Sequence, residues 1–207
     1  MRIAWLVVGV AAAGCVPRLY TDDAGGEGEP WAAPENRWPV GAPPEGLEGE
    51  GLEPGDVAVD VRGPDQFGDL TSLWQFHGRW ILVDISTMWC SPCQDLAKGT
   101  EEVQREFESR GFTYLTLLHE NVDNEPPSVD DLKYWATVPS FGDGPYDLIT
   151  APIVADPRGR SGSASAVRAN TYPVVLLVGP DLRVVERVEP PTEERVIEVL
   201  EERLPPG

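Results

Sequence analysis

The chain has 207 residues, of which 41% are hydrophobic, and its formal net charge at pH 7 is -19. This length and apolar content suffice for one hydrophobic core, so a single globular domain with additional segments is expected. The negative charge would repel the phosphates of nucleic acids, and no stripe of lysine or arginine offsets it, so nucleic acid is excluded as a partner.

The first residues have the pattern of an export signal. Arg2 is followed by an apolar run over residues 3–13, which is too short to span a bilayer comfortably. The sequence therefore predicts a signal peptide over residues 1–14.

The cysteine that follows has small residues before it. Residues 12–15, Ala-Ala-Gly-Cys, resemble the bacterial lipobox, although the usual leucine is an alanine here. The resemblance implies that Cys15 is lipidated, becomes the N-terminus and anchors the protein to a membrane of the cell envelope, facing the periplasm. Val16 favours the outer membrane by the same resemblance. The alternative is ordinary cleavage after Ala13, which would leave Cys15 as a free thiol.

The next segment is rich in proline, glycine and acidic residues and has no periodic apolar pattern. Such a segment cannot recover its ordering entropy by burial. The sequence therefore predicts a disordered acidic tether over residues 15–54. Trp31 and Trp38 are exceptions, which either dock on the domain or, as is commoner for isolated aromatics, lie incidentally in the linker.

The folded domain is expected over residues 55–207. Residues 57–61 alternate as an edge strand, and Arg-Gly-Pro-Asp at 62–65 is typical of a turn. The apolar run over residues 80–86 then predicts a buried central strand.

The sequence Trp-Cys-Ser-Pro-Cys at 89–93 ends this strand and opens a helix. Unpaired N–H groups and the dipole at a helix N-terminus favour a thiolate, so Cys90 is the candidate nucleophile with a lowered pKa. Cys93 is close enough to form a reversible disulfide and is the candidate resolving thiol. The alternatives are a permanent disulfide and half of a zinc site. The zinc site lacks a second cysteine pair, and the only histidines are His77 and His119.

The rest of the chain continues this α/β pattern, with unusually long loops over residues 119–159. Thr192 is positioned to cap the last helix. The expected elements are a helix carrying Leu96, Thr100, Val103 and Phe107, a parallel strand at 112–118, a helix at 129–136, a strand at 152–155, antiparallel strands at 174–178 and 184–188, and a C-terminal helix.

These features resemble the thioredoxin fold, an α/β fold with a central mixed sheet flanked by helices. The N-terminal strand, the turn at 78–79 and the insertion before Tyr172 resemble the tethered TlpA/ResA-type branch of extracytoplasmic oxidoreductases. The resemblance implies that Pro173 is a cis-proline against the dithiol, and that Tyr172 and Trp89 contact the substrate. It also implies that Asp84, six residues before Cys90, is the buried acid that manages the proton of the resolving cysteine.

The expected function is thiol-disulfide exchange with partner proteins, without a metal or other cofactor, by a monomer. Reduction is the favoured direction, because Ser91 and Pro92 lack the histidine of strong oxidants and because the family resemblance suggests cytochrome maturation or similar repair. Two alternatives remain. Thr87 matches part of the peroxiredoxin Thr-x-x-Cys pattern, but Val83 stands where a proline is expected. A non-catalytic binding lipoprotein could also keep the cysteine pair as a staple.

Overall fold

The computed structural model describes residues 36–137, 148–156 and 171–207. Its centre is a mixed sheet with the strand order β5-β4-β3-β6-β7. β4 pairs parallel with β3 and β5, whereas β6 pairs antiparallel with β3 and β7. The strands are β3 (Trp80–Ser86), β4 (Phe112–Leu118), β5 (Ile153–Ala155), β6 (Val174–Val178) and β7 (Val184–Arg187). The expected thioredoxin-like sheet is confirmed.

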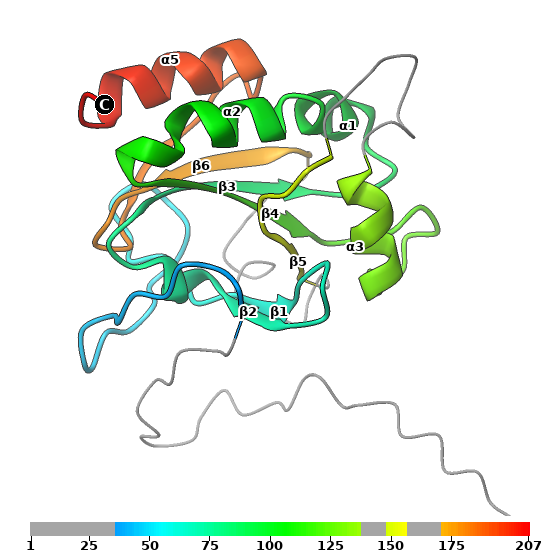
Figure 1. Ribbon diagram of the computed structural model, residues 1–207, viewed down its shortest axis with the longest axis horizontal. Helices are drawn as coiled ribbons and strands as arrows, with labels where there is room; N and C mark the ends of the chain where they lie inside the picture. Colours follow the sequence, from blue (N-terminus) through cyan, green and yellow to red (C-terminus); the bar gives the residue numbers. More distant parts are fainter. Residues whose placement is uncertain (1–35, 138–147, 157–170) are drawn as a thin grey trace, which may run out of the picture.

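Both faces of the sheet are covered (Figure 1). One face carries α1 (Ser91–Ala97), α2 (Thr100–Phe107) and α5 (Glu193–Arg203), and the other carries β1 (Arg62–Pro64) and β2 (Leu70–Ser72). The remaining elements are η1 (Leu73–Phe76), η2 (Glu108–Arg110) and α3 (Val129–Ala136). Parallel strands covered on both faces have continuous apolar sequences, which is why β3 and β4 could be recognised.

Successive residues of β3 point into two different cores. Leu82 belongs to the first core, beneath α1, α2 and α5, whereas Ile81 and Val83 belong to the second core, beneath β1 and β2. Asp84 follows the same alternation as Leu82, so its side chain points to the face that carries α1.

The helix expected after the dithiol is two helices. α1 ends at Ala97 and α2 begins at Thr100, with Gly99 at the N-cap position of α2. A Cβ at Gly99 would lie 2.4 Å from the carboxylate of Glu193 in the first turn of α5. This carboxylate is the far end of a flexible side chain that can move aside, so the low helix propensity of glycine, rather than this contact, favours the break between the two helices.

The strand expected at 57–61 and the turn expected at 62–65 are wrong. Val57 and Ala58 form only isolated bridges, to Arg183 and Gly51 respectively. The antiparallel strands are instead β1 and β2. The alternation at 57–61 reflects burial in the second core rather than regular pairing.

The segment 36–54, expected to belong to a disordered tether, packs on the domain. Trp38 Nε1 donates a hydrogen bond of 2.6 Å to Asp65 Oδ2, and Asn36 Nδ2 donates one of 3.0 Å to Gln75 Oε1. Leu52 is buried in the second core. The packed part of the chain therefore begins before the expected boundary near Gly55. The predicted signal peptide, Cys15 and Trp31 lie outside the described residues.

The C-terminal helix agrees with the prediction. The Thr192 side chain accepts a hydrogen bond from the backbone N–H of Arg195 and caps α5, which buries Val196, Val199 and Leu200. Within the described ranges, no helix has both the length and the apolar character needed to cross a bilayer.

Candidate redox site

The dithiol lies where the chain passes from β3 into α1. Cys90 is the N-cap residue of α1, and its sulfur accepts a hydrogen bond of 3.2 Å from the backbone N–H of Cys93. Pro92 occupies the first turn, where a missing N–H breaks no helical hydrogen bond. Cys90 and Cys93 form a disulfide, with their Cα atoms 5.2 Å apart. The structure thus has the strand-to-helix dithiol that the sequence predicted.

The two sulfur-bearing residues differ in their access to solvent. Cys90 is 5% exposed and Cys93 is 0% exposed. The neighbouring Trp89 is 45% exposed, and its Nε1 donates to Glu120 Oε2 at 2.9 Å. Cys90 is therefore the less buried of the two cysteines and lies next to an exposed aromatic ring, whereas Cys93 is fully covered.

After reduction, iodoacetamide is expected to alkylate Cys90 at least about tenfold faster than Cys93, because Cys90 is the accessible thiol and lies at a helix N-terminus. Peptide mass spectrometry after timed quenching gives both rates between pH 5 and 9. In 6 M guanidinium chloride the two rates should converge. Equal rates in the folded protein would contradict the assignment of Cys90 as nucleophile.

Asp84 is a fully buried acid on β3. Its carboxylate accepts hydrogen bonds from Ser86 Oγ at 2.7 Å and from Tyr114 Oη at 3.4 Å. Burial raises the pKa of Asp84 to about 7, and the hydrogen bonds from Ser86 and Tyr114 offset this only in part. A carboxyl group with this pKa can accept and release a proton near neutral pH, as the assigned role requires. Sequence reasoning could have identified Ser86 as a hydrogen-bond partner of Asp84, since it lies two residues after Asp84 on the same strand.

Tyr172 and Trp89 meet beside the dithiol. Their rings are 5.9 Å apart between centroids, in an edge-on arrangement. The bond between Tyr172 and Pro173 is cis, as the resemblance implied. β6 begins at the next residue, Val174, which pairs with Ile85 near the end of β3. We call Trp89 and Tyr172 the aromatic rim.

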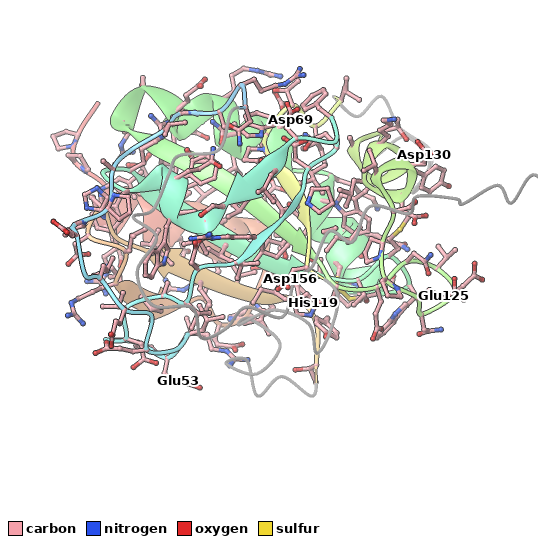
Figure 2. The ribbon with its side chains drawn as sticks, turned by 90° about the horizontal axis from the view of Figure 1, so that it is seen from below. Glu53, Asp69, His119, Glu125, Asp130 and Asp156 are labelled. Carbon is pink, nitrogen blue, oxygen red and sulfur yellow. A yellow bond between two sulfur atoms is a disulfide. The ribbon has the colours of Figure 1, made fainter. Side chains whose placement is uncertain are left out.

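Two further residues of this region were missed as site residues. His119 Nδ1 lies 3.1 Å from Tyr172 Oη, and His119 Nε2 lies 3.2 Å from Asp156 Oδ2. Figure 2 shows His119 and Asp156 next to each other. Burial raises the pKa of Asp156, and His119 opposes this effect. A sequence signal existed, because each residue directly follows a parallel strand, the edge at which α/β sheets gather functional side chains.

The described ranges contain no group of three or more histidine, cysteine, aspartate or glutamate side chains placed to hold a metal ion.

Comparisons with known proteins agree with this fold. A Bacillus subtilis protein described as thioredoxin-like protein YneN is 23% identical over 128 residues, which are 62% of this chain and 66% of that protein. The chain thus spans slightly less than two thirds of this relative. The solved thioredoxin domain of a thiol-disulfide oxidoreductase from Bacteroides vulgatus superposes with a TM-score of 0.60 at 19% identity, covering 74% of this chain and 99% of that domain.

A thiol:disulfide interchange protein from a Bacteroides species has a TM-score of 0.59 at 19% identity, covering 74% of this chain and 91% of that structure. At this identity the likeness establishes the fold. The sequence profile of the AhpC/TSA family matches residues 54–187. Since this match spans well over half of the chain and includes the strand, the dithiol and the cis-proline, the chain belongs to the AhpC/TSA family.

Proposed function

We propose that this protein is a thiol-disulfide oxidoreductase that exchanges disulfides with partner proteins, and that it acts as a reductant. The observation that carries the proposal is the Cys90–Cys93 disulfide at the start of α1, in which Cys90 is slightly exposed and Cys93 is fully covered. A buried acid on the same sheet face, Asp84, supplies a group that titrates near neutral pH.

In the reducing direction, the Cys90 thiolate attacks one sulfur of a partner disulfide. The partner S–S bond breaks, the first partner sulfur leaves as a thiolate and takes a proton from solvent, and a mixed disulfide remains. Cys93 passes its proton to Asp84 through water and attacks the Cys90 sulfur. The second partner sulfur leaves as a thiolate. The Cys90–Cys93 dithiol has then been oxidised to a disulfide, and its two electrons have reduced the partner disulfide to two thiols.

The aromatic rim is the proposed contact for the partner chain. Trp89 is held by Glu120 and by the edge of Tyr172, yet almost half of its surface faces solvent. Aromatic side chains of this kind supply apolar contact area with little loss of conformational entropy. The backbone of Tyr172, next to Pro173, is the proposed pairing edge for an extended segment of the partner.

Thiol peroxidase activity is the second candidate, because the matching family profile is AhpC/TSA and Thr87 stands three residues before Cys90. Val83 occupies the position where the peroxiredoxin pattern has proline. Parallel assays separate the candidates: the purified mature chain should reduce insulin disulfides with dithiothreitol as electron donor and consume hydrogen peroxide no faster than free dithiothreitol does. Faster peroxide consumption would favour the peroxidase, and inactivity in both assays would favour a binding module.

The direction of exchange depends on the reduction potential of the dithiol. Related dithiols span about -270 to about -120 mV, and a reductant requires a value toward the lower end. Equilibration with glutathione buffers measures this potential. A value near -120 mV would overturn the reductant assignment while leaving disulfide exchange intact.

We further propose that the protein is an envelope lipoprotein facing the periplasm, with Cys15 as the lipidated residue. The support is the export pattern and the lipobox-like sequence at residues 12–15. Mass spectrometry of the membrane-bound protein should find a diacylglyceryl-modified Cys15 at the N-terminus, and Cys15→Ser should release the protein from the membrane fraction. An unmodified N-terminus at Gly14 would contradict this proposal.

A further inference from the structure

A buried polar pair lies directly behind the aromatic rim. His119 follows β4 and Asp156 follows β5, and backbone hydrogen bonds extend the parallel ladder to both of them. The His119 N–H donates to Ser86 O at 2.9 Å, and the Asp156 N–H donates to Leu118 O at 3.0 Å. The two side chains therefore project from the sheet itself, which is more rigid than a loop.

The pair is almost completely removed from solvent. His119 is 2% exposed and Asp156 is 0% exposed. Among the described residues, neither carboxylate oxygen of Asp156 has a partner with good hydrogen-bond geometry, and His119 Nε2 lies 3.2 Å from Oδ2. Burial of such a pair is weak evidence for a stabilising role, because well-packed apolar residues of the same volume often stabilise a core as well or better. Burial by itself is therefore no reason to assign the pair a stabilising role.

The pair fixes the orientation of Tyr172. The Asp156 carboxylate lies 3.2 Å from His119 Nε2, and a carboxylate at this position favours the tautomer that carries its proton on Nε2. This leaves Nδ1 as the acceptor for the Tyr172 hydroxyl, 3.1 Å away. The His119 ring also contacts the Tyr172 ring edge-on, with centroids 5.7 Å apart. Tyr172 is thus held by His119 and Trp89 together.

We propose that His119 and Asp156 are positioning residues for partner binding, which hold Tyr172 and thereby the backbone beside Pro173 in the arrangement that receives an extended polypeptide across the dithiol. The inference rests on the proposed disulfide exchange and narrows its substrate class. A disulfide flanked by polypeptide depends on the aromatic rim, whereas a small organic disulfide needs only the accessible Cys90.

Tyr172→Phe is the most direct test, because it removes one oxygen from a half-buried side chain and leaves the ring contacts in place. With the mature chain and insulin as substrate, KM is expected to rise about fivefold, as for the loss of one neutral hydrogen bond, while kcat changes less than twofold. The rate with bis(2-hydroxyethyl) disulfide should be unchanged. His77→Gln, at the other histidine of the chain, is the matched control and should behave as wild type.

A double-mutant comparison tests whether His119 acts through Tyr172. His119→Leu should raise KM for insulin as Tyr172→Phe does, and the double variant should be no worse than either single one. Asp156→Asn keeps an acceptor oxygen and should retain a KM within twofold of wild type, whereas Asp156→Ala should match His119→Leu. Circular dichroism checks that each variant is folded. If the variants of His119 and Asp156 do not fold, the KM of Tyr172→Phe alone tests the inference.

Three results would overturn the inference: an unchanged KM in Tyr172→Phe, an equal loss with the small disulfide, or additive effects in the double variant. Wild-type protein that reduces neither disulfide would instead overturn the proposed function, and the inference with it.

Discussion

Replacement of Cys93 by serine is expected to stop turnover and to leave the protein linked to its partner through Cys90. Cys90 is the accessible cysteine and can still attack a partner disulfide, but the covered position no longer carries a thiol to release it. Multiple-turnover reduction should fall at least about a thousandfold, as for the loss of an essential nucleophile. Non-reducing gel electrophoresis and intact mass spectrometry should show the mixed disulfide in a 1:1 ratio.

Two variants serve as controls for this result. Cys90→Ser should abolish both turnover and the mixed disulfide, because the attacking thiol of the dithiol is lost. Ser91→Ala changes the exposed residue between the cysteines and should retain turnover within a few-fold. Sustained turnover by Cys90→Ser would contradict the mechanism, since it would place the attacking thiol elsewhere.

Asp84→Asn is expected to stabilise the oxidised protein above neutral pH. The pKa of Asp84 is about 7 in the folded protein and near 3.8 when solvated, so between these values the folded state binds more protons than the unfolded state. The free energy of unfolding of the wild type therefore falls as pH rises from about 4 to about 7. An asparagine cannot ionise, so the variant does not lose stability in this way. Its free energy of unfolding should exceed that of the wild type by up to about 4 kcal/mol above pH 7 and by almost nothing near pH 4.

Urea denaturation of both proteins between pH 4 and 9 measures this difference. Asp95→Asn, in the ion pair between the exposed Asp95 of α1 and Lys98 at its C-cap, is the matched control and should shift stability by less than about 1 kcal/mol. The same Asp84 variant should slow the release of mixed disulfides at pH 7, because the proposed proton acceptor of Cys93 is lost. A stability difference that does not grow with pH would show that Asp84 is not the buried titrating acid.

The thioredoxin-like fold explains where the redox site lies but not which substrate it takes. The fold places a dithiol, a buried acid and a cis-proline at one edge of the sheet, but it does not by itself select a substrate. The selection is proposed to lie in the aromatic rim and in the residues that hold it. The insulin and small-disulfide assays therefore probe a property of this chain's own side chains.

The sequence alone determined the features that depend on local pattern. Continuous apolar runs specified β3 and β4 because strands covered on both faces must be apolar on both faces. The spacing of Cys90 and Cys93 specified a pair that can close within one helical turn. Thr192 specified the start of α5, because a side-chain cap satisfies a backbone donor locally.

Only the tertiary structure decided the features that depend on contacts between distant segments. Trp38 lies in a composition typical of a linker, yet it reaches the buried Asp65, and this partner is invisible in the local sequence. The helix expected after the dithiol is interrupted at Gly99, and the side chain that lies against this break, Glu193 of α5, is more than ninety residues away. His119 and Asp156 read separately as loop residues, and they form a pair behind Tyr172 because the parallel ladder aligns the ends of β4 and β5.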